Sequence, residues 1–373
     1  MREDRGQMIR NLVRKNILGI KPYEPGKPVE ELKRELNISN IVKLASNENP
    51  LGPSKKAIKA MREAASNVNR YPDGNCYYLK QALSRYLNVS PENLIIGNGS
   101  NEIIELAMKT FVDKNEEVII SEPSFLIYNI ACRAAGGSPV IVPLKDFRTD
   151  LNAIKDSITD KTKLIFIDNP NNPTGGSVGE MEVEAFMEKL PGNVIVVFDE
   201  AYNEFVERED FPDTIRYIGR KNIIILRTFS KAHGLSGLRI GYGIAEEETV
   251  RLMNRSRQPF NVNSMAQAAA IASIEDKKHI TKSKAAVCKG KRLLYEELDS
   301  MELDYVRSDT NFILIDVKRD GKDVFENMLK EGVIVRDMKA YKLDSYIRVT
   351  IGTMPENRRF VTALRKVLSA PDK

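Results

Sequence analysis

Residues that could take part in chemistry gather at four places along the 373-residue chain, each directly after a short apolar run. The first place is the glycine-rich turn GNGSNE at 97–102, where Ser100, Asn101 and Glu102 would begin a helix. Backbone N–H groups at a helix start are free to bind a phosphate. Because a capped helix without a ligand would use the same residues, this turn alone leaves both interpretations open.

The second place is NPNNPTG at 169–175, which follows the apolar run KLIFID. Its prolines and glycine fix an irregular backbone that can present a side chain at a strand end. Asn172 could there donate a hydrogen bond to an oxygen on an aromatic ring. A plain turn would explain the prolines and the glycine but not the whole seven-residue string.

The third place is DEAY at 199–202, which ends the apolar run NVIVVFD. Asp199 would be costly to bury at such a strand end without a cationic partner. A protonated pyridine nitrogen would be such a partner, and Asp199 would keep that ring electron-withdrawing. Tyr202 lies three residues further on and could reach the same place. The alternative is that Asp199 caps a helix N-terminus.

The fourth place is RTFSKAHGLSGLRIGYG at 227–243, which follows another apolar run. Lys231 comes after Ser230, and Arg239 follows eight residues later. A partly desolvated lysine near cationic groups has a lowered pKa, as imine formation requires. Ser230 and Arg239 are suitable phosphate ligands. The alternative is that Lys231 is a solvated surface group, as most lysines are.

The four places together contain what a pyridoxal phosphate (PLP) cofactor needs. They provide phosphate anchors, a group for each polar position of the ring and an amine that forms an imine. The sequence therefore predicts a PLP enzyme in which Lys231 binds the cofactor and Asp199 holds the ring nitrogen.

The elements that must position these residues form an α/β pattern between about 94 and 243. Six short apolar runs alternate there with helical stretches, at 94–97, 117–121, 139–143, 163–168, 193–199 and 222–228. Continuous Val/Ile/Leu runs are typical of strands buried on both faces, hence of a mainly parallel sheet with helices on both sides. Ligands of such sheets bind at the carboxyl ends of the strands.

The flanking segments differ from this pattern. Residues 1–50 predict an N-terminal arm that packs with a small domain. Within it, PYEPGKPVEELKREL predicts an extended stretch with one short helix, and Ser54 is expected to cap the next helix. After Gly243 we expect long helices with a bend near Pro259, then two strands separated by a helix, and a terminal helix. We accordingly expect a large PLP-binding α/β domain at 51–260 and a smaller α+β domain at 261–373.

Composition excludes several other classes of protein. The net charge of +5 comes from 57 basic and 52 acidic residues without a Lys/Arg block, so we expect no nucleic-acid partner. The three cysteines form no CxxC pair and histidine occurs only twice, so we expect no metal site and a reduced, cytoplasmic setting. No apolar run is long enough for a membrane span.

The motifs NPNNPTG, DEAY and SKAHGLSGLRIGY resemble those of the PLP enzymes of fold type I, the aspartate-aminotransferase fold. Within that fold, PYEPGKPVEEL, NENPLGPS, GVIVRDM and YIRVTIGT are similar to the histidinol-phosphate aminotransferase family. The resemblance covers nearly the whole chain. It implies a homodimer that moves an amino group between L-histidinol phosphate and 2-oxoglutarate, giving imidazole acetol phosphate and glutamate, in histidine biosynthesis.

The resemblance also implies roles for the cofactor residues. Lys231 would carry the imine, Asp199 would pair with the pyridinium, and Asn172 and Tyr202 would bind the ring hydroxyl. The groups expected to bind the phosphate are Ser230, Arg239, the backbone around Ser100, Asn101 and Glu102, and Tyr71 of a partner chain.

For the substrate, the resemblance implies that Arg348 binds the anionic group with Arg336 as a second arginine. Tyr23 matches a substrate-contacting tyrosine of the N-terminal arm, and Asn172 also faces the substrate. One departure is Phe125, which stands where the family often has a tyrosine stacked on the cofactor ring. Since stacking needs only the aromatic face, cofactor binding should survive this change.

Three other functions use the same cofactor residues. An aminotransferase for aromatic amino acids would need only a similar aryl pocket, and threonine-phosphate decarboxylase, a lyase, also binds a small phosphorylated substrate. A PLP-binding regulator without turnover usually carries an appended DNA-binding domain, for which this sequence shows no segment.

Overall fold

The largest sheet has seven strands in the order β2-β8-β7-β6-β5-β3-β4 in the computed structural model, which describes residues 8–24, 26–36 and 40–370. The strands are β2 (Leu94–Gly97), β3 (Glu117–Glu122), β4 (Ser138–Pro143), β5 (Thr162–Asp168), β6 (Ile195–Asp199), β7 (Ile223–Thr228) and β8 (Gly241–Ala245). Neighbouring strands are parallel except for β8, which runs antiparallel to both β2 and β7. All six apolar runs are therefore strands, as predicted.

Strand β8 was not predicted, because its sequence GYGIA contains two glycines, which weaken a strand pattern. The structure explains why one of these residues, Gly241, must be a glycine. A Cβ on Gly241 would lie 2.5 Å from the backbone nitrogen of Ser100, so only glycine permits this close approach to the next helix.

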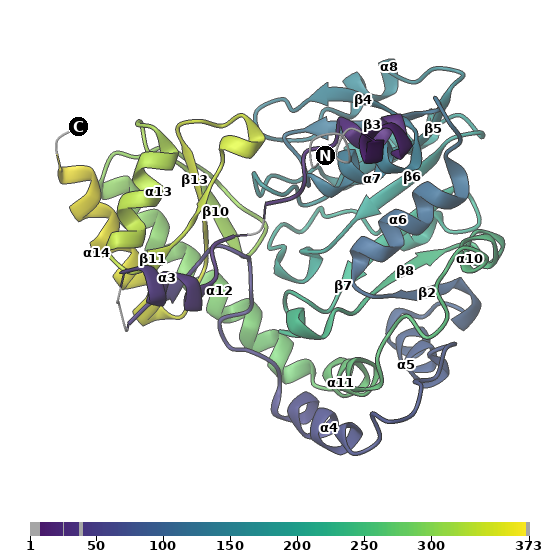
Figure 1. Cartoon of the computed structure of the whole chain (residues 1–373), viewed down its shortest axis with the longest axis horizontal. Coiled ribbons are helices and arrows are strands. Elements are labelled where there is room, and N and C mark those ends of the chain that lie inside the picture. Colours follow the sequence, from purple (N-terminus) through teal and green to yellow (C-terminus); the bar gives the residue numbers. More distant parts are fainter. Residues whose placement is uncertain (1–7, 25, 37–39, 371–373) are drawn as a thin grey trace.

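Alternate residues of the large sheet face two separate apolar clusters, and each cluster is closed by helices. One face is covered by α6 (Ser100–Phe111), α7 (Ile127–Ala135) and α10 (Glu247–Asn254). The other face is covered by α4 (Lys55–Ala65), α5 (Tyr77–Leu87), α8 (Leu151–Asp156), α9 (Glu180–Glu188) and α11 (Ser264–Ile274). The expected mainly parallel sheet with helices on both faces is thus confirmed (Figure 1).

Helix α4 begins where the sequence indicates. The Ser54 hydroxyl accepts a hydrogen bond from the backbone nitrogen of Ala57 at 3.1 Å, which is the expected N-cap contact.

A second sheet lies beside the first and has four antiparallel strands in the order β12-β13-β10-β9 (Figure 1). They are β9 (Tyr305–Val306), β10 (Phe312–Asp316), β12 (Arg336–Asp337) and β13 (Tyr346–Thr350). Helices α12 (Lys277–Ser300), α13 (Gly321–Lys330) and α14 (Met354–Ser369) pack around its separate core. The two predicted strands are β10 and β13, whereas β9 and β12 are too short to give a periodic pattern.

The N-terminal segment joins both sheets. Helix α2 (Lys15–Leu18) lies against α7, since the Asn16 amide donates to the carbonyls of Arg133 and Ala134 at 2.6 and 3.2 Å. Helix α3 (Val29–Leu36) buries Leu32 beside the second sheet, where β1 (Val42–Lys43) pairs with β11 (Val333–Ile334). The one short helix expected within PYEPGKPVEELKREL is α3, as predicted, whereas α2 was not predicted, because a four-residue helix such as KNIL leaves no periodic signal.

The stretch after Gly243 contains three helices, α10, α11 and α12, where we expected long helices with a bend near Pro259. The break between α10 and α11 covers residues 255–263 and includes Phe260 at φ 55°. Helix α11 packs on α4 and α5 rather than on the second sheet. In the described part of the chain, no helix is long and apolar enough to cross a membrane.

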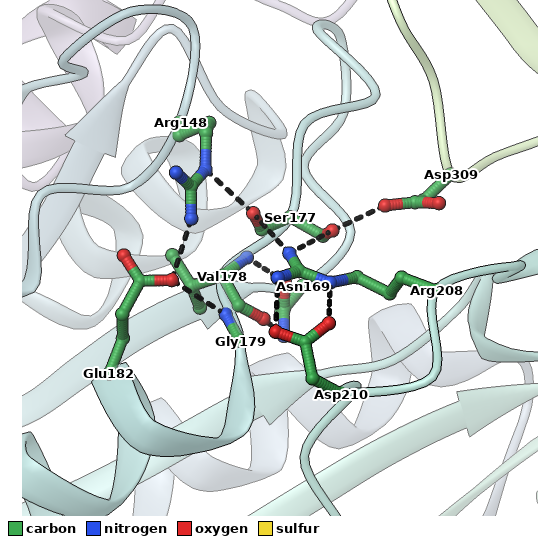
Figure 2. A network of polar contacts seen from close by, with 9 residues as sticks. All are labelled: Arg148, Asn169, Ser177, Val178, Gly179, Glu182, Arg208, Asp210 and Asp309. Atoms are coloured by element: carbon green, nitrogen blue, oxygen red, sulfur yellow. Dashed lines mark hydrogen bonds and ion pairs between the residues drawn. The ribbon is translucent and has the colours of Figure 1, made fainter.

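A polar cluster joins the NPNNPTG loop to the segment before β10 (Figure 2). The Ser177 hydroxyl donates to the Asp309 carboxylate, and the backbone nitrogen of Asp309 donates to the Gly175 carbonyl at 2.9 Å. Gly175 has φ +84°, and a Cβ there would lie 2.3 Å from the Ser308 hydroxyl oxygen. Arg208 secures the loop by donating to both oxygens of Ser177 at 3.0 Å. The contacts of residues 175 and 177 with Asp309, hereafter the 175–309 clasp, help to hold the two sheets against each other.

Candidate active site

A cavity of about 260 Å³ opens between the two sheets, at the carboxyl ends of β5, β6 and β7. Twelve of the fourteen residues expected at a site from the sequence line it: Tyr23, Ser100, Asn101, Phe125, Asn172, Asp199, Tyr202, Ser230, Lys231, Arg239, Arg336 and Arg348. The two others, Glu102 and Tyr71, do not. Residues far apart in the sequence therefore meet in one place, and their contacts indicate what each can do.

Lys231 follows β7 and its amine points into the cavity. Its Nζ lies 3.4 Å from the Ser46 carbonyl and 5.3 Å from the centre of the Tyr202 ring. Burial, followed by the nearby charge of Arg348, lowers the pKa of Lys231 to about 8. A larger fraction of the amine is thus neutral, and therefore nucleophilic, at physiological pH than in an ordinary lysine.

Asp199 ends β6 and is only 5% exposed. Its Oδ2 accepts a hydrogen bond from the Tyr128 hydroxyl at 2.7 Å, and its Oδ1 accepts one from the backbone nitrogen of Ala201 at 3.1 Å. Among the described residues, no Lys or Arg nitrogen lies within 4.0 Å of this carboxylate. Burial raises the pKa of Asp199 to about 6. The helix-cap alternative does not describe this residue, since the short helix that follows begins after Tyr202.

A second buried acid, Asp168, lies beside Asp199 at the end of β5, and the two are register partners. Its carboxylate accepts from the Asn171 amide at 3.0 Å and from the backbone nitrogen of Asn172 at 3.1 Å. Burial raises the pKa of Asp168 to about 7. Asp168 thus shapes the loop that presents Asn172. Sequence reasoning missed it, although it ends an apolar strand just as Asp199 does.

Tyr202 and Asn172, the two residues expected at a ring hydroxyl, both line the cavity. The Tyr202 hydroxyl accepts from the Asn47 amide at 2.9 Å, and burial raises the pKa of Tyr202 to about 12. The Asn172 side-chain oxygen accepts from the Arg348 guanidinium. Asn47 was missed, because NENP served in the sequence only as a mark of resemblance.

The opposite end of the cavity is suited to an anion. Gly99 has φ +76° at the start of α6, and no side chain caps that helix. A Cβ on Gly99 would lie 2.5 Å from an Arg239 nitrogen, so glycine makes room for the guanidinium. That guanidinium also lies 3.5 Å from the Ser230 hydroxyl. Free N–H groups at Ser100 and Asn101, a hydroxyl and an arginine together make a phosphate cradle.

The Glu102 side chain does not contribute to this cradle. Its carboxylate accepts from the backbone nitrogen of Asn98 at 2.5 Å and from the Asn261 amide at 2.7 Å. It therefore holds the glycine-rich turn in place from outside the cavity.

Tyr71 lies on the surface of its own chain. Its side chain is 82% exposed and stacks on Phe260, with ring centroids 4.7 Å apart. A role at the cavity would therefore require a second chain to bring the residue there.

Phe125 borders the cavity with its ring set edge-on against Tyr128, at 5.6 Å between centroids. Tyr128 in turn stacks on Phe166 at 4.6 Å. Phe125 and Tyr128 thus form part of the cavity wall, and Phe166 supports Tyr128.

The two arginines from the second sheet are side by side. Arg336 on β12 pairs with Arg348 on β13 in antiparallel register, so both side chains project from the same face. Arg348 is 6% exposed and also donates to the Ala45 carbonyl at 3.1 Å, but its buried Nε has no partner among the described residues. Arg336 donates to the Glu24 carbonyl at 2.8 Å and lies 5.9 Å from the Tyr23 ring centre. Like charges opposite each other are unfavourable, and an anion between them would offset that cost.

These observations fit the cofactor that the sequence predicts. Asp199 is a buried acid without a cation, the glycine-made cradle suits a phosphate, and Lys231 is an amine with a lowered pKa between them. The unpaired Nε of Arg348 leaves a donor for a second anion.

Comparison with known proteins agrees with this arrangement. The chain matches the aminotransferase class I and II family over residues 39–364 and belongs to that family. It is 48% identical over 358 residues to the histidinol-phosphate aminotransferase of Moorella thermoacetica, covering 95% of this chain and 93% of that protein.

Solved structures show the same fold. The histidinol-phosphate aminotransferase of Sinorhizobium meliloti, solved in complex with pyridoxal-5'-phosphate, superposes with a TM-score of 0.88 at 28% identity, covering 95% of this chain and 97% of that one. Aspartate aminotransferase from Thermus thermophilus with maleate shares the fold at 22% identity, with a TM-score of 0.83 and coverage of 95% and 99%. The expected fold type I of PLP enzymes is confirmed.

The lowered pKa of Lys231 gives a prediction for the cofactor-free protein. Folding opposes protonation of this amine, so the folded state binds fewer protons than the unfolded state between pH about 8 and the ordinary lysine value of 10.5. Lys231→Met, which buries no charge, should therefore melt at a higher temperature than the original protein at pH 7. Because the neutral amine costs less to bury, the difference should shrink at pH 9.5. Melting curves of both proteins without cofactor measure this, and a less stable variant at pH 7 would contradict it.

Proposed function

We propose that this aminotransferase moves an amino group between L-histidinol phosphate and 2-oxoglutarate in histidine biosynthesis, giving imidazole acetol phosphate and glutamate. The cofactor is pyridoxal 5'-phosphate, attached through Lys231. The observation that carries the choice of substrate is the arginine pair, Arg336 and Arg348, projecting together from adjacent strands beside the cavity. Relatives at 48% and 47% identity that bear the name histidinol-phosphate aminotransferase support it.

The cofactor supplies an electron sink for the negative charge that develops on the substrate carbon when its proton leaves. Asp199 holds a proton on the ring nitrogen, which keeps the ring electron-withdrawing. The Lys231 amine would hold the cofactor and would carry a proton to and from the substrate carbon. Asn172 and Tyr202 orient the ring through its hydroxyl, and Phe125 provides an aromatic face.

The phosphate of the cofactor is held by Ser230, Arg239 and the backbone at Ser100 and Asn101. Three kinds of donor meet there: a hydroxyl, a guanidinium and the N-terminal N–H groups of α6. Such a set would hold the phosphate of the cofactor at the end of the cavity opposite to Asp199.

The phosphate group of the substrate explains why two arginines are needed beside the cavity. The reacting amine of histidinol phosphate has no neighbouring carboxylate, so another group must orient the molecule. Its doubly charged phosphate benefits from two guanidinium groups, Arg336 and Arg348, with the Tyr23 hydroxyl adding a donor. For 2-oxoglutarate, Arg348 binds the carboxylate next to the reacting carbonyl.

We also propose a homodimer in which Tyr71 reaches the phosphate of the partner's cofactor. Its support is the stack of Tyr71 on Phe260, an exposed aromatic surface that a partner chain would cover. The division into an arm at 1–50, a PLP-binding domain at 51–260 and a small domain at 261–373 is part of the same proposal, with helix α11 of the last segment packing on the PLP-binding domain. The pairing of β1 with β11 supports packing of the arm with the small domain. Three free cysteines are in keeping with work in the cytoplasm.

The attachment of the cofactor tests the proposed chemistry directly. Purified protein with PLP should show visible absorption of an imine, and borohydride should fix the cofactor on the peptide that contains Lys231. Peptide mass spectrometry identifies the labelled lysine. Lys289, an exposed lysine of α12, should carry no label, and label on any lysine other than Lys231 would overturn the assignment.

Arg336 tests the choice of substrate. Arg336→Gln removes one of two charge-assisted partners of the phosphate, each contributing roughly 1.5–3 kcal/mol. The KM for histidinol phosphate should therefore rise by about ten-fold or more. The KM for phenylalanine, which has no phosphate, should change much less.

A panel of amino donors completes this test. Histidinol phosphate should exceed phenylalanine, tyrosine and threonine phosphate in kcat/KM with 2-oxoglutarate as acceptor. Equal losses for histidinol phosphate and phenylalanine in Arg336→Gln would favour an aromatic aminotransferase. Carbon dioxide released from threonine phosphate would favour the decarboxylase.

Mixed dimers test whether Tyr71 acts across an interface. A dimer of Tyr71→Phe with Lys231→Ala contains one site that has both an intact lysine and an intact partner tyrosine. Mixing equal amounts of the two variants and allowing subunit exchange should restore about a quarter of the original activity, because half of the dimers are then mixed and each of these has one intact site of two. As a control, Lys231→Ala mixed with Asp199→Asn should restore none, because both residues belong to one chain's site. A fully active monomer would contradict the proposal.

A further inference from the structure

Tyr128 is a buried tyrosine at the cavity for which the proposed chemistry has so far no use. It lies near the start of α7 and is 1% exposed. Phe166 stacks on its ring at an interplanar angle of 25°, and Phe125 meets it at 86°. Because the ring is held by both neighbours, the position of its hydroxyl is fixed. That hydroxyl donates to Asp199 Oδ2 at 2.7 Å.

We propose that Tyr128 is a positioning residue, whose hydroxyl orients the Asp199 carboxylate and keeps it charged for the cofactor's ring nitrogen. The inference rests on the proposed function, since it assigns Tyr128 a part in the same chemistry. Tyr128 acts only through Asp199 and need not touch the cofactor ring nitrogen itself.

The hydrogen bonds of Asp199 favour this role. Each carboxylate oxygen has one neutral donor, the Tyr128 hydroxyl at Oδ2 and the backbone nitrogen of Ala201 at Oδ1. A carboxylate offers about four acceptor positions, so capacity remains for a ring N–H. Neutral donors fix the plane of the carboxylate without cancelling its charge. A lysine or arginine in the place of Tyr128 would fix the group equally well but would compete with the pyridinium.

The surrounding charges explain why the donor matters. The negative charges of Asp168, on β5, and of Glu200, the next residue in the chain, disfavour the charged form of Asp199. The positive charge of Lys231 favours it. The charge of Glu200 is largely compensated by Arg227, whose Nε lies 2.9 Å away. Burial opposes the charged form most, and the Tyr128 hydrogen bond is the largest contribution that lowers the pKa of Asp199. Burial also raises the pKa of Tyr128 well above its ordinary value, so Tyr128 remains a donor.

The alternative is a purely structural role, in which the buried Tyr128 hydroxyl needs a hydrogen-bond acceptor and Asp199 provides it. Tyr128→Phe separates the two roles, because it keeps the ring and its contacts with Phe125 and Phe166 and removes the donor alone. A structural role would lower the melting temperature and leave the pH dependence of cofactor binding unchanged. A positioning role would change that pH dependence.

The first experiment measures PLP affinity of the cofactor-free protein between pH 5.5 and 8.5. Without the hydroxyl, Asp199 should take up a proton at a higher pH, so binding should begin to weaken at a higher pH as the solution is acidified. Near pH 6.5 the dissociation constant of Tyr128→Phe should exceed that of the original protein by about ten-fold. Tyr295→Phe is the matched control, because its hydroxyl binds the backbone nitrogen of Ser308 away from the cavity. It should leave the profile unchanged.

A double-variant cycle tests whether Tyr128 acts through Asp199. If it does, adding Tyr128→Phe to Asp199→Asn should weaken PLP binding by less than about two-fold. Independent, multiplying losses in the double variant would overturn the proposal, as would an unshifted pH profile in Tyr128→Phe.

A second readout needs no cofactor. The pKa of Asp199 is raised by folding from 3.8 to about 6, so the folded state binds the extra proton and stability falls as pH rises through that interval. In Tyr128→Phe this fall should extend to higher pH, as measured by melting temperature. If the original protein bound no PLP at Lys231, the proposed function would fail while this readout still tested the contact. If the original protein bound PLP normally and Tyr128→Phe left the pH profiles of PLP affinity and of melting temperature unchanged, only the inference on Tyr128 would be overturned.

Discussion

Burial of ionisable groups without matching partners is the constraint on which the cavity depends. Among the residues that the structure describes, Asp199 accepts hydrogen bonds only from neutral donors, and the Lys231 amine contacts a backbone carbonyl. The charged form of each group is therefore less stable in the folded protein than in water. The raised pKa of Asp199 and the lowered pKa of Lys231 reflect this cost. A ligand with a cationic ring nitrogen and a reactive carbonyl relieves both costs. Binding of that ligand then stabilises the fold by linkage.

The segment at 45–49 connects the cavity residues to the rest of the molecule through hydrogen bonds. Its Ala45 carbonyl accepts from Arg348, and its Asn47 amide donates to the Tyr202 hydroxyl. The Asn49 amide donates to the Ala232 carbonyl at 2.7 Å, directly after Lys231. One short segment thus contacts the second sheet, the DEAY turn and the lysine turn. Asn47 and Asn49 are buried and make these hydrogen bonds. This explains why the segment has polar side chains although it is buried.

The sequence predicted elements with a local pattern and missed contacts without one. Apolar runs such as 163–168 predict strands because both faces are buried, and they also placed Asp199 and Lys231 at one edge of the sheet. The bond between Tyr128 and Asp199 joins residues 71 positions apart, so no spacing reveals it. The glycine-rich β8 was hidden by its composition. The roles of the cavity residues and the domain boundaries stay predictions, since no geometry alone tests them.

The 175–309 clasp lies close to Arg348 along the second sheet. Strand β10 begins three residues after Asp309, and its first residue, Phe312, pairs with Thr350. Arg348 stands opposite Leu314, only two residues further along, roughly 7 Å at the usual rise per residue. The strands that carry Arg348 are therefore anchored, within a few residues of it, to the loop that presents Asn172. The contact between Arg348 and Asn172 thus depends on the local join between this loop and β10 rather than on the far ends of either sheet.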